Sequence, residues 1–202
     1  MRKPADSRKV LILAATLLLL GIVMLIVQGC ARIPLQYVPG AVSKVSGNVS
    51  VSDFKYLPAE AGKVKPFQIS NTALRSLKFD KDIHVFFTDA VSAELRFAGV
   101  KLDDKTRVLG GEIEDFLINE LSSSADWTLK VHYLVKNLQT GEMVYASTKI
   151  TKRNASKLVN VNSALNEMIK LNVDELLKDE AFIKAINQKP RRILKNNSSL
   201  NG

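Results

Sequence analysis

The sequence predicts an α+β protein: a two-layer sandwich with an antiparallel sheet of about four strands packed by two main helices, preceded by a cleaved signal segment. Three observations support this fold class. Apolar residues recur at helical spacing after Ile83 and again after Asn160. They alternate as in strands over residues 108–151, and a long apolar run occupies residues 10–27. Strands and helices that follow one another in separate runs are typical of this class.

The first thirty residues have the organisation of an export signal. Four cations precede the apolar run: Arg2, Lys3, Arg8 and Lys9. The run contains nothing more polar than Thr16 and Gly21, and it is followed by Gln28, Gly29 and Cys30, the only cysteine in the chain. A positive start, a hydrophobic centre and a small residue at the cleavage point make a secretory signal.

The end of this signal resembles the lipobox of bacterial lipoproteins, with Val27 three residues before Cys30 and Gly29 directly before it. The resemblance implies that the cysteine thiol receives a diacylglycerol, that the chain is cut before it, and that the new amino terminus is acylated. Gln28 departs from the pattern, which usually has a small residue at that position. Because Ala31 rather than an aspartate follows the cysteine, the resemblance also implies an outer-membrane lipid anchor that faces the periplasm.

The alternative is a signal anchor that is never cut. Residues 10–27 lie at the lower edge of the length that spans a bilayer as one helix, and they exceed the usual hydrophobic centre of a secretory signal. Both interpretations export the rest of the chain, because the preceding cations favour a cytoplasmic start. They differ in the anchor, which is lipid on Cys30 in one and an inner-membrane helix in the other.

Length and charge limit the domain count and the kind of partner of the chain that follows the signal peptide (residues 1–29). Its removal leaves 202 − 29 = 173 residues, which suits one compact domain with a tether and a tail. The four cations and Asp6 give the removed segment a net charge of +3, so the mature chain retains 9 − 3 = +6. This surplus suits anionic lipid or cell-wall polymer, and export argues against nucleic acid as a partner. With its one cysteine consumed by lipid, the domain forms no internal disulfide.

The mature chain is predicted to begin with the lipidated cysteine and a tether, residues 30–47. This stretch contains two prolines, two glycines and no apolar period, and fully extended it reaches on the order of 55 Å at about 3.3 Å per residue. The globular domain, residues 48–187, opens with a strand in which valines alternate with serines. Residues 57–76 are irregular, with a short strand at 67–69.

The next segment predicts an amphipathic helix that Asp80 or Asp82 caps and that Gly99 ends with a left-handed residue. Its apolar stripe is Ile83, Phe86, Phe87, Ala90, Val91, Leu95 and Ala98. Strands follow at 108–118, 127–135 and 143–151. One face of the second strand carries its apolar residues: Trp127, Leu129, Val131, Tyr133 and Val135. The last strand also alternates, with the more apolar side formed by Val144, Ala146, Thr148 and Ile150.

Residues 139–142 have the composition of a turn and join the last two strands as a hairpin. A second amphipathic helix covers about residues 160–178, and Asp179 is positioned to cap a short final helix. The remainder, residues 188–202, is predicted to be a basic disordered tail. Its cations are a candidate contact with the membrane surface or a partner, the alternative being a solvated tail without contacts: Lys189, Arg191, Arg192 and Lys195.

This order resembles small YajG-like bacterial lipoproteins. The residues that carry the resemblance are Ala98-Gly99-Val100 at the end of a helix, Leu109-Gly110-Gly111-Glu112-Ile113-Glu114, Trp127-Thr128-Leu129-Lys130-Val131, and the turn Thr140-Gly141-Glu142 before a long helix. The pattern is also similar to the domain shared by the curli secretion lipoprotein CsgG and the penicillin-binding-protein activator LpoB. It covers about residues 48–187 and implies a domain that acts through protein contacts.

The sequence offers little catalytic chemistry. His84 and His132 have no second ligand at metal spacing. The serines at 122–124 lie outside a Gly-x-Ser-x-Gly motif, and Gly110-Gly111 is a bulge or a close backbone approach rather than a phosphate loop. We therefore expect no catalytic residue, no metal site and no cofactor.

Three carboxylates, Glu112, Glu114 and Asp115, are candidates for an acid–base pair or a calcium site. Strand alternation places the first two on one face and Asp115 on the other, which separates them. A solvated acidic strand edge is the favoured interpretation.

Two functional classes follow. We expect a lipid-anchored, non-catalytic accessory protein of the cell envelope, with an envelope protein or a second copy of the chain as partner. The alternative is a carrier of a lipid or other apolar ligand, or a hydrolase, which needs a concave site with convergent polar groups. An apolar cavity between helices and sheet would favour the carrier, and a filled core would favour the accessory protein.

Overall fold

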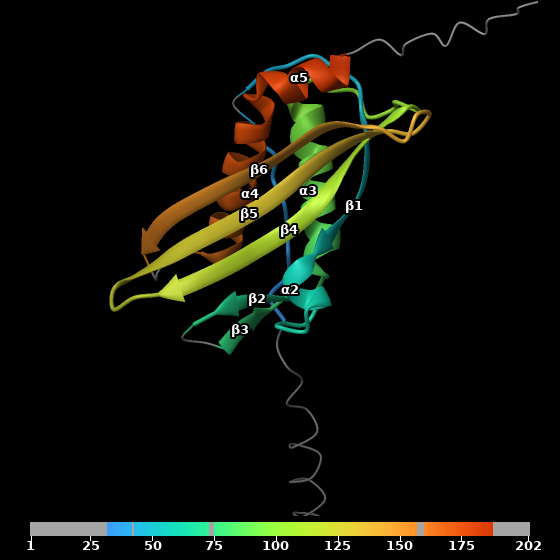
Figure 1. Ribbon diagram of the computed structural model, residues 1–202. Coiled ribbons are helices and arrows are strands. Elements are labelled where there is room, and N and C mark those ends of the chain that lie inside the picture. The colour runs from blue at the N-terminus through green and yellow to red at the C-terminus, as the bar shows by residue number, and fades with distance from the viewer. Residues whose placement is uncertain (1–31, 42, 73–74, 157–159, 188–202) are drawn as a thin grey trace, which may run out of the picture. The chain divides into compact units, whose positions relative to one another are not determined.

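Figure 1 shows a computed structural model of the chain, which describes residues 32–41, 43–72, 75–156 and 160–187. The chain divides into two units, Met1–Arg32 and Ile33–Gly202, and the fold is that of the second unit. The predicted signal peptide, Cys30 and the basic tail lie outside the described residues. Within the described ranges, no helix has both the length and the hydrophobicity that a transmembrane span requires.

The second unit is built on one sheet of six strands (Figure 1). The three long strands at its centre and one edge each have 14 residues: β4 (Arg107–Glu120), β5 (Ser124–Asn137) and β6 (Met143–Ser156). They pair antiparallel, and the turn predicted at residues 139–142 joins β5 to β6 with Gly141 at φ 74°. The shorter strands are β1 (Ser50–Tyr56), β2 (Gln68–Asn71) and β3 (Arg75–Lys78).

The sheet is mixed, which corrects the prediction of an antiparallel sheet of about four strands. Both β1 and β2 run parallel to β4 and share its second edge, at residues 108–113 and 117–118 respectively. β3 then pairs antiparallel with β2. The parallel pairs close across long stretches of chain, including a helix, and alternation within a strand carries no information on the direction of its neighbour.

Helices cover one face of this sheet, as predicted (Figure 1). α3 (Ile83–Ala98) ends at Gly99 with φ 106°, and α4 (Val161–Leu177) begins at Asn160, whose side chain accepts hydrogen bonds from two backbone N–H groups of the first turn. α5 (Glu180–Asn187) follows, and Asp179 Oδ1 accepts from the N–H of Ala181 as a cap. A single turn, α2 (Leu57–Glu60), follows β1.

Aromatic side chains fill the space between sheet and helices. Phe54 makes edge-on contacts with Phe87 of α3 and with Tyr133 of β5, at ring-centroid distances of 5.1 and 5.7 Å. All three side chains are buried, together with the apolar stripes of α3 and α4. The predicted inward face of β5 is confirmed, because Trp127, Leu129, Val131, Tyr133 and Val135 are all buried.

Residues 33–41 and 43–47, here called the strap, contradict the prediction of an extended tether. They pack on the domain instead of reaching away from it, and Leu35 and Ala41 are buried. At one end Ile33 bridges to Phe79, and at the other the N–H of Lys101 donates to the carbonyl of Gly47 at 3.0 Å. The prolines and glycines prevent a regular element, as expected, but they do not prevent docking through side chains of other elements.

Candidate functional site

One side of α4 holds the strap through a row of polar side chains four or eight residues apart. Asn162 Nδ2 donates to the carbonyl of Pro34, and Asn166 Nδ2 donates to that of Gln36, both at 2.7 Å. About two turns further along the helix, Asp174 Oδ1 accepts from the hydroxyl of Ser43 at 2.7 Å. Residues spaced by four lie on one face of a helix, so α4 presents a continuous polar track to the strap.

On the other side of the strap, α3 contributes a buried carboxylate. Glu94 Oε1 accepts from the Tyr37 hydroxyl and from the N–H of Gly40, the latter at 2.9 Å. The Glu94 side chain is fully buried, and its second oxygen has no hydrogen-bond partner among the described residues. Burial, reinforced by the hydrogen bond to Glu94, raises the pKa of Tyr37 well above its ordinary value. The hydroxyl therefore stays protonated and continues to donate.

Two further carboxylates join α4 and α5 to their surroundings. Burial alone would raise the pKa of Asp174, but hydrogen bonds from Lys178 and Ser43 lower it below its ordinary value. Burial alone would also raise the pKa of Asp179, but hydrogen bonds from Lys149 and Tyr145 outweigh this effect and lower it below its ordinary value. Both groups are thus ionised at neutral pH and bind their donors in the charged form.

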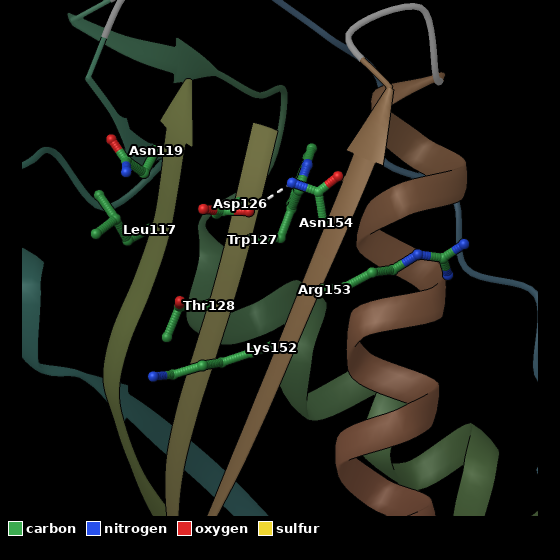
Figure 2. A pocket seen from close by; sticks show the side chains of 8 residues that line it. All are labelled: Leu117, Asn119, Asp126, Trp127, Thr128, Lys152, Arg153 and Asn154. Atoms are coloured by element: carbon green, nitrogen blue, oxygen red, sulfur yellow. Dashed lines mark hydrogen bonds between the residues drawn. The ribbon is translucent and has the colours of Figure 1, made fainter. Parts of the chain in front are cut away.

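The sheet face opposite the helices carries a hollow at one end of β4, β5 and β6 (Figure 2). Its volume is about 460 Å³. Two cross-strand rows form its floor: Leu117, Thr128 and Lys152 in one, and Asn119, Asp126 and Asn154 in the other. Asn154 Nδ2 donates to Asp126 Oδ1 at 2.7 Å. Figure 2 also shows Arg153 directed to the helix side, where it forms an ion pair with Glu167.

The composition of this hollow decides what it suits. Small-molecule pockets are mostly apolar with a few polar groups, whereas here Leu117 is the one apolar side chain among the six in the two rows. An amide, a carboxylate, a hydroxyl and an ammonium group in neighbouring positions offer both donors and acceptors to an approaching surface. The floor of the hollow therefore offers polar groups for hydrogen bonds to an approaching surface.

The two histidines lie apart. His84 is in the first turn of α3, half-buried, and its carbonyl accepts from the Thr88 hydroxyl at 2.8 Å. It lines a second hollow of about 390 Å³ with Phe54, Tyr56 and Asp82. His132 is half-buried on β5. Among the described residues, no three side chains of the metal-ligating types gather closely enough to hold an ion.

A bulge in β4 changes the predicted arrangement of its carboxylates. The register with β5 shifts between Ile113 and Asp115, so Asp115 is opposite Lys130, and Glu114 forms an ion pair with the same lysine at 2.8 Å. The prediction of strict alternation is therefore wrong beyond Ile113. Glu114 and Asp115 both lie near Lys130 instead of being separated by the sheet. Glu112 lies 4.0 Å from the ammonium of Lys55 on β1.

The predicted lipidation site, Cys30, and the predicted tail contacts lie outside the described residues: Lys189, Arg191, Arg192 and Lys195. The strap-binding side chains were not predicted from the sequence, although two signals were present. Glu94 interrupts the apolar stripe of α3, and Asn162 and Asn166 are four residues apart, on one face of α4. A polar residue inside an apolar stripe indicates a buried partner.

No protein-family model and no curated protein matches this chain. Among solved structures, it is similar to protein XCC0632 from Xanthomonas campestris, described with the family model DUF330, at 12% identity and TM-score 0.54 over 77% of this chain and 95% of that one. The PelC dodecamer from Paraburkholderia phytofirmans is similar at 12% identity and TM-score 0.41, over 75% and 96% of the two chains. Rare lipoprotein B from Shewanella oneidensis is similar at 15% identity and TM-score 0.31, over 68% and 87%. Only the first is similar enough to support the architecture, and at that identity it supports the fold alone.

Proposed function

We propose that this chain is a lipid-anchored envelope protein that works as a non-catalytic accessory by binding another protein, and that its anchor is lipid on Cys30 in the outer membrane. The observation that carries the binding role is the polar hollow on the sheet face of β4, β5 and β6. Helices cover the opposite face, so the hollow is where the long strands present their side chains to a partner.

The packed interior supports the accessory role over that of an apolar carrier. Phe54, Phe87 and Tyr133 occupy the layer between α3 and the sheet, where a carrier of this architecture would place its ligand. A lipid chain entering there would have to displace well-packed aromatic side chains, because the interior is packed about as densely as an organic crystal.

The anchor is tested by replacing Cys30 with serine. Metabolic labelling with a palmitate analogue is expected to mark the wild-type chain and to spare Cys30→Ser, because the oxygen of serine does not replace the acylated thiol in this modification. The labelled protein should co-sediment with outer-membrane markers in a sucrose gradient. Equal labelling of both chains would contradict the lipid anchor, and sedimentation with inner-membrane markers would contradict the sorting.

The binding role is tested at the hollow in the native envelope. A photo-crosslinking residue at Thr128 is expected to capture a discrete adduct, because its side chain is the middle one of the row Leu117, Thr128 and Lys152. The matched control carries the same residue at Lys184, an exposed position of α5. Mass spectrometry of the Thr128 adduct separates a different envelope protein from a second copy of this chain. Adducts of equal yield at both positions would show that the hollow has no particular partner.

A further inference from the structure

The strap enters the domain at a fixed place beside β3. The N–H of Ile33 donates to the carbonyl of Lys78 at 2.9 Å, and the N–H of Asp80 donates back to the carbonyl of Ile33 at 3.0 Å. Ile33 is only three residues from Cys30, and three residues of extended chain span at most about 10 Å. An anchor on Cys30 therefore keeps this end of the domain close to the lipid, whatever conformation the intervening residues adopt.

Lysines gather around the same place. Lys63, Lys65, Lys78 and Lys81, here called the lysine face, are all exposed. Gln68 links two of them: β3 pairs Lys78 with Gln68, and the side-chain oxygen Oε1 of Gln68 accepts from the N–H of Lys65 at 3.0 Å. Figure 1 shows α2, β2 and β3 at one end of the domain, with α5 and the β5–β6 hairpin at the other.

Three carboxylates moderate the charge of this end: Glu60, Asp80 and Asp82. Asp80 is already engaged, since its Oδ1 accepts from the N–H of Leu35 at 2.9 Å. The face is thus mildly basic, and long-range attraction alone would hold it weakly. The tether changes this balance, because a linker of about 10 Å is comparable to the Debye length of about 8 Å at physiological salt. Lysines beside Ile33 are then held about one Debye length from the headgroups, where salt weakens their attraction without abolishing it.

We propose that the lysine face lies against anionic lipid headgroups of the membrane that carries the anchor, so that the domain stands on its β2–β3 end and directs the β5–β6 hairpin away from the membrane. This inference rests on the proposed lipid anchor. Cations near such a surface are attracted to it, and once the chain is anchored a small surplus of them favours one orientation over the others. The proposal depends on the docked strap, because an extended strap would let the domain move far from the lipid on Cys30.

The full acylated chain, reconstituted in phosphatidylethanolamine–phosphatidylglycerol vesicles, provides the test. Its one native thiol carries the lipid, so a single introduced cysteine can be labelled with a fluorophore. Lys63→Cys reports on the lysine face, and Gln139→Cys in the exposed hairpin turn is the matched control. β2 meets β4 at Leu117 and the hairpin lies opposite Arg107, 117 − 107 = 10 residues away, or about 33 Å along the strand. A headgroup quencher is expected to quench the label at residue 63 strongly and the label at residue 139 weakly.

Two comparisons decide the outcome. Equal quenching at both positions, with acylation confirmed by intact mass, would overturn the orientation and leave the anchor standing. An unacylated chain would overturn the anchor and the orientation with it. Replacing Lys65, Lys78 and Lys81 with glutamine should reduce the quenching at residue 63, as should phosphatidylcholine vesicles. If quenching at residue 63 is unchanged in the glutamine variant and in phosphatidylcholine vesicles, the lipid anchor alone keeps this end near the membrane. That result would overturn the contact with anionic headgroups.

Discussion

Of the two glycines in β4, Gly111 has the less room for a side chain. A Cβ atom there would lie 2.0 Å from the carbonyl oxygen of His132, a backbone atom of the neighbouring strand that cannot move without disturbing the sheet. Gly110, next to it, differs in kind, because its Cβ would meet the hydroxyl of Ser52 at 2.5 Å. That hydroxyl is the end of a side chain, which can rotate away.

Gly111→Ala is therefore expected to lower the free energy of unfolding by at least about 2 kcal/mol, since it forces backbone atoms apart. Gly110→Ala, the matched control, should cost less than about 1 kcal/mol because Ser52 can adopt another rotamer. Urea unfolding of the two variants measures the difference. A larger loss at Gly110 than at Gly111 would contradict this account of the close approach between Gly111 and the backbone of β5.

Glu94 is the residue that holds the strap most tightly from the α3 side. Glu94→Ala leaves the Tyr37 hydroxyl and the Gly40 N–H without their acceptor, so we expect a loss of about 2–4 kcal/mol. Tyr37→Phe removes one of the two donors and should cost about 1 kcal/mol. Asp89→Ala, at an exposed carboxylate on the same helix, should stay within about 0.5 kcal/mol of the wild type.

Limited proteolysis distinguishes loss of strap docking from general instability. Cleavage between residues 33 and 47 is expected to be faster in Glu94→Ala than in Asp89→Ala under conditions in which both remain folded. Equal cleavage rates would mean that Glu94 does not hold the strap.

At the scale of elements, the sequence predicted what depends on local pattern. The bounds of α3 and α4, the inward face of β5 and the β5–β6 hairpin follow from periodicity and turn chemistry, and all are confirmed. The parallel pairing of β1 and β2 and the docking of the strap depend on partners more than 40 residues away along the chain. Their recognition needs the three-dimensional arrangement, so pattern alone did not reveal them.

β6 shows the same limit within one strand. Its more apolar side faces solvent, with Ile150 54% exposed, while Lys149 and Arg153 face the helices. Each of these cations has an acidic partner. Lys149 Nζ lies 2.7 Å from Asp179 Oδ2, and Arg153 forms an ion pair with Glu167. Inward-pointing charges on an edge strand also oppose unwanted pairing with another sheet, since a shift of register would separate them from their partners.

For the whole molecule, the carboxylates of Asp174 and Asp179 couple stability to pH. Their pKa values in the folded chain lie below the ordinary value of 3.8, so their contribution is fully present above that value. It is lost as the pH falls through the folded-state pKa values. The free energy of unfolding is thus expected to fall below about pH 4, as protonation releases Lys178 and Lys149 from their partners.

Asp179→Asn isolates one part of this effect. The variant should be less stable than the wild type at pH 7, because an amide does not attract Lys149 as a carboxylate does. The difference should shrink on acidification through the carboxylate's pKa, as the wild type loses the same charge. Urea unfolding between pH 7 and pH 3 measures both curves, and a gap that stays constant would contradict the assignment.

The strap joins the first residues of the domain to its last. Asn162 binds Pro34 across 128 positions of sequence, and Asn187 binds the carbonyl of Ser46 across 141. Under the proposed export route the strap leaves the cytoplasm before the rest of the domain, so it has no partner until α4 and α5 have followed it across the membrane. Such long-range closure comes late in folding. A chain truncated before α4 therefore lacks the partners of Pro34 and Ser46, and its strap is open to proteolysis.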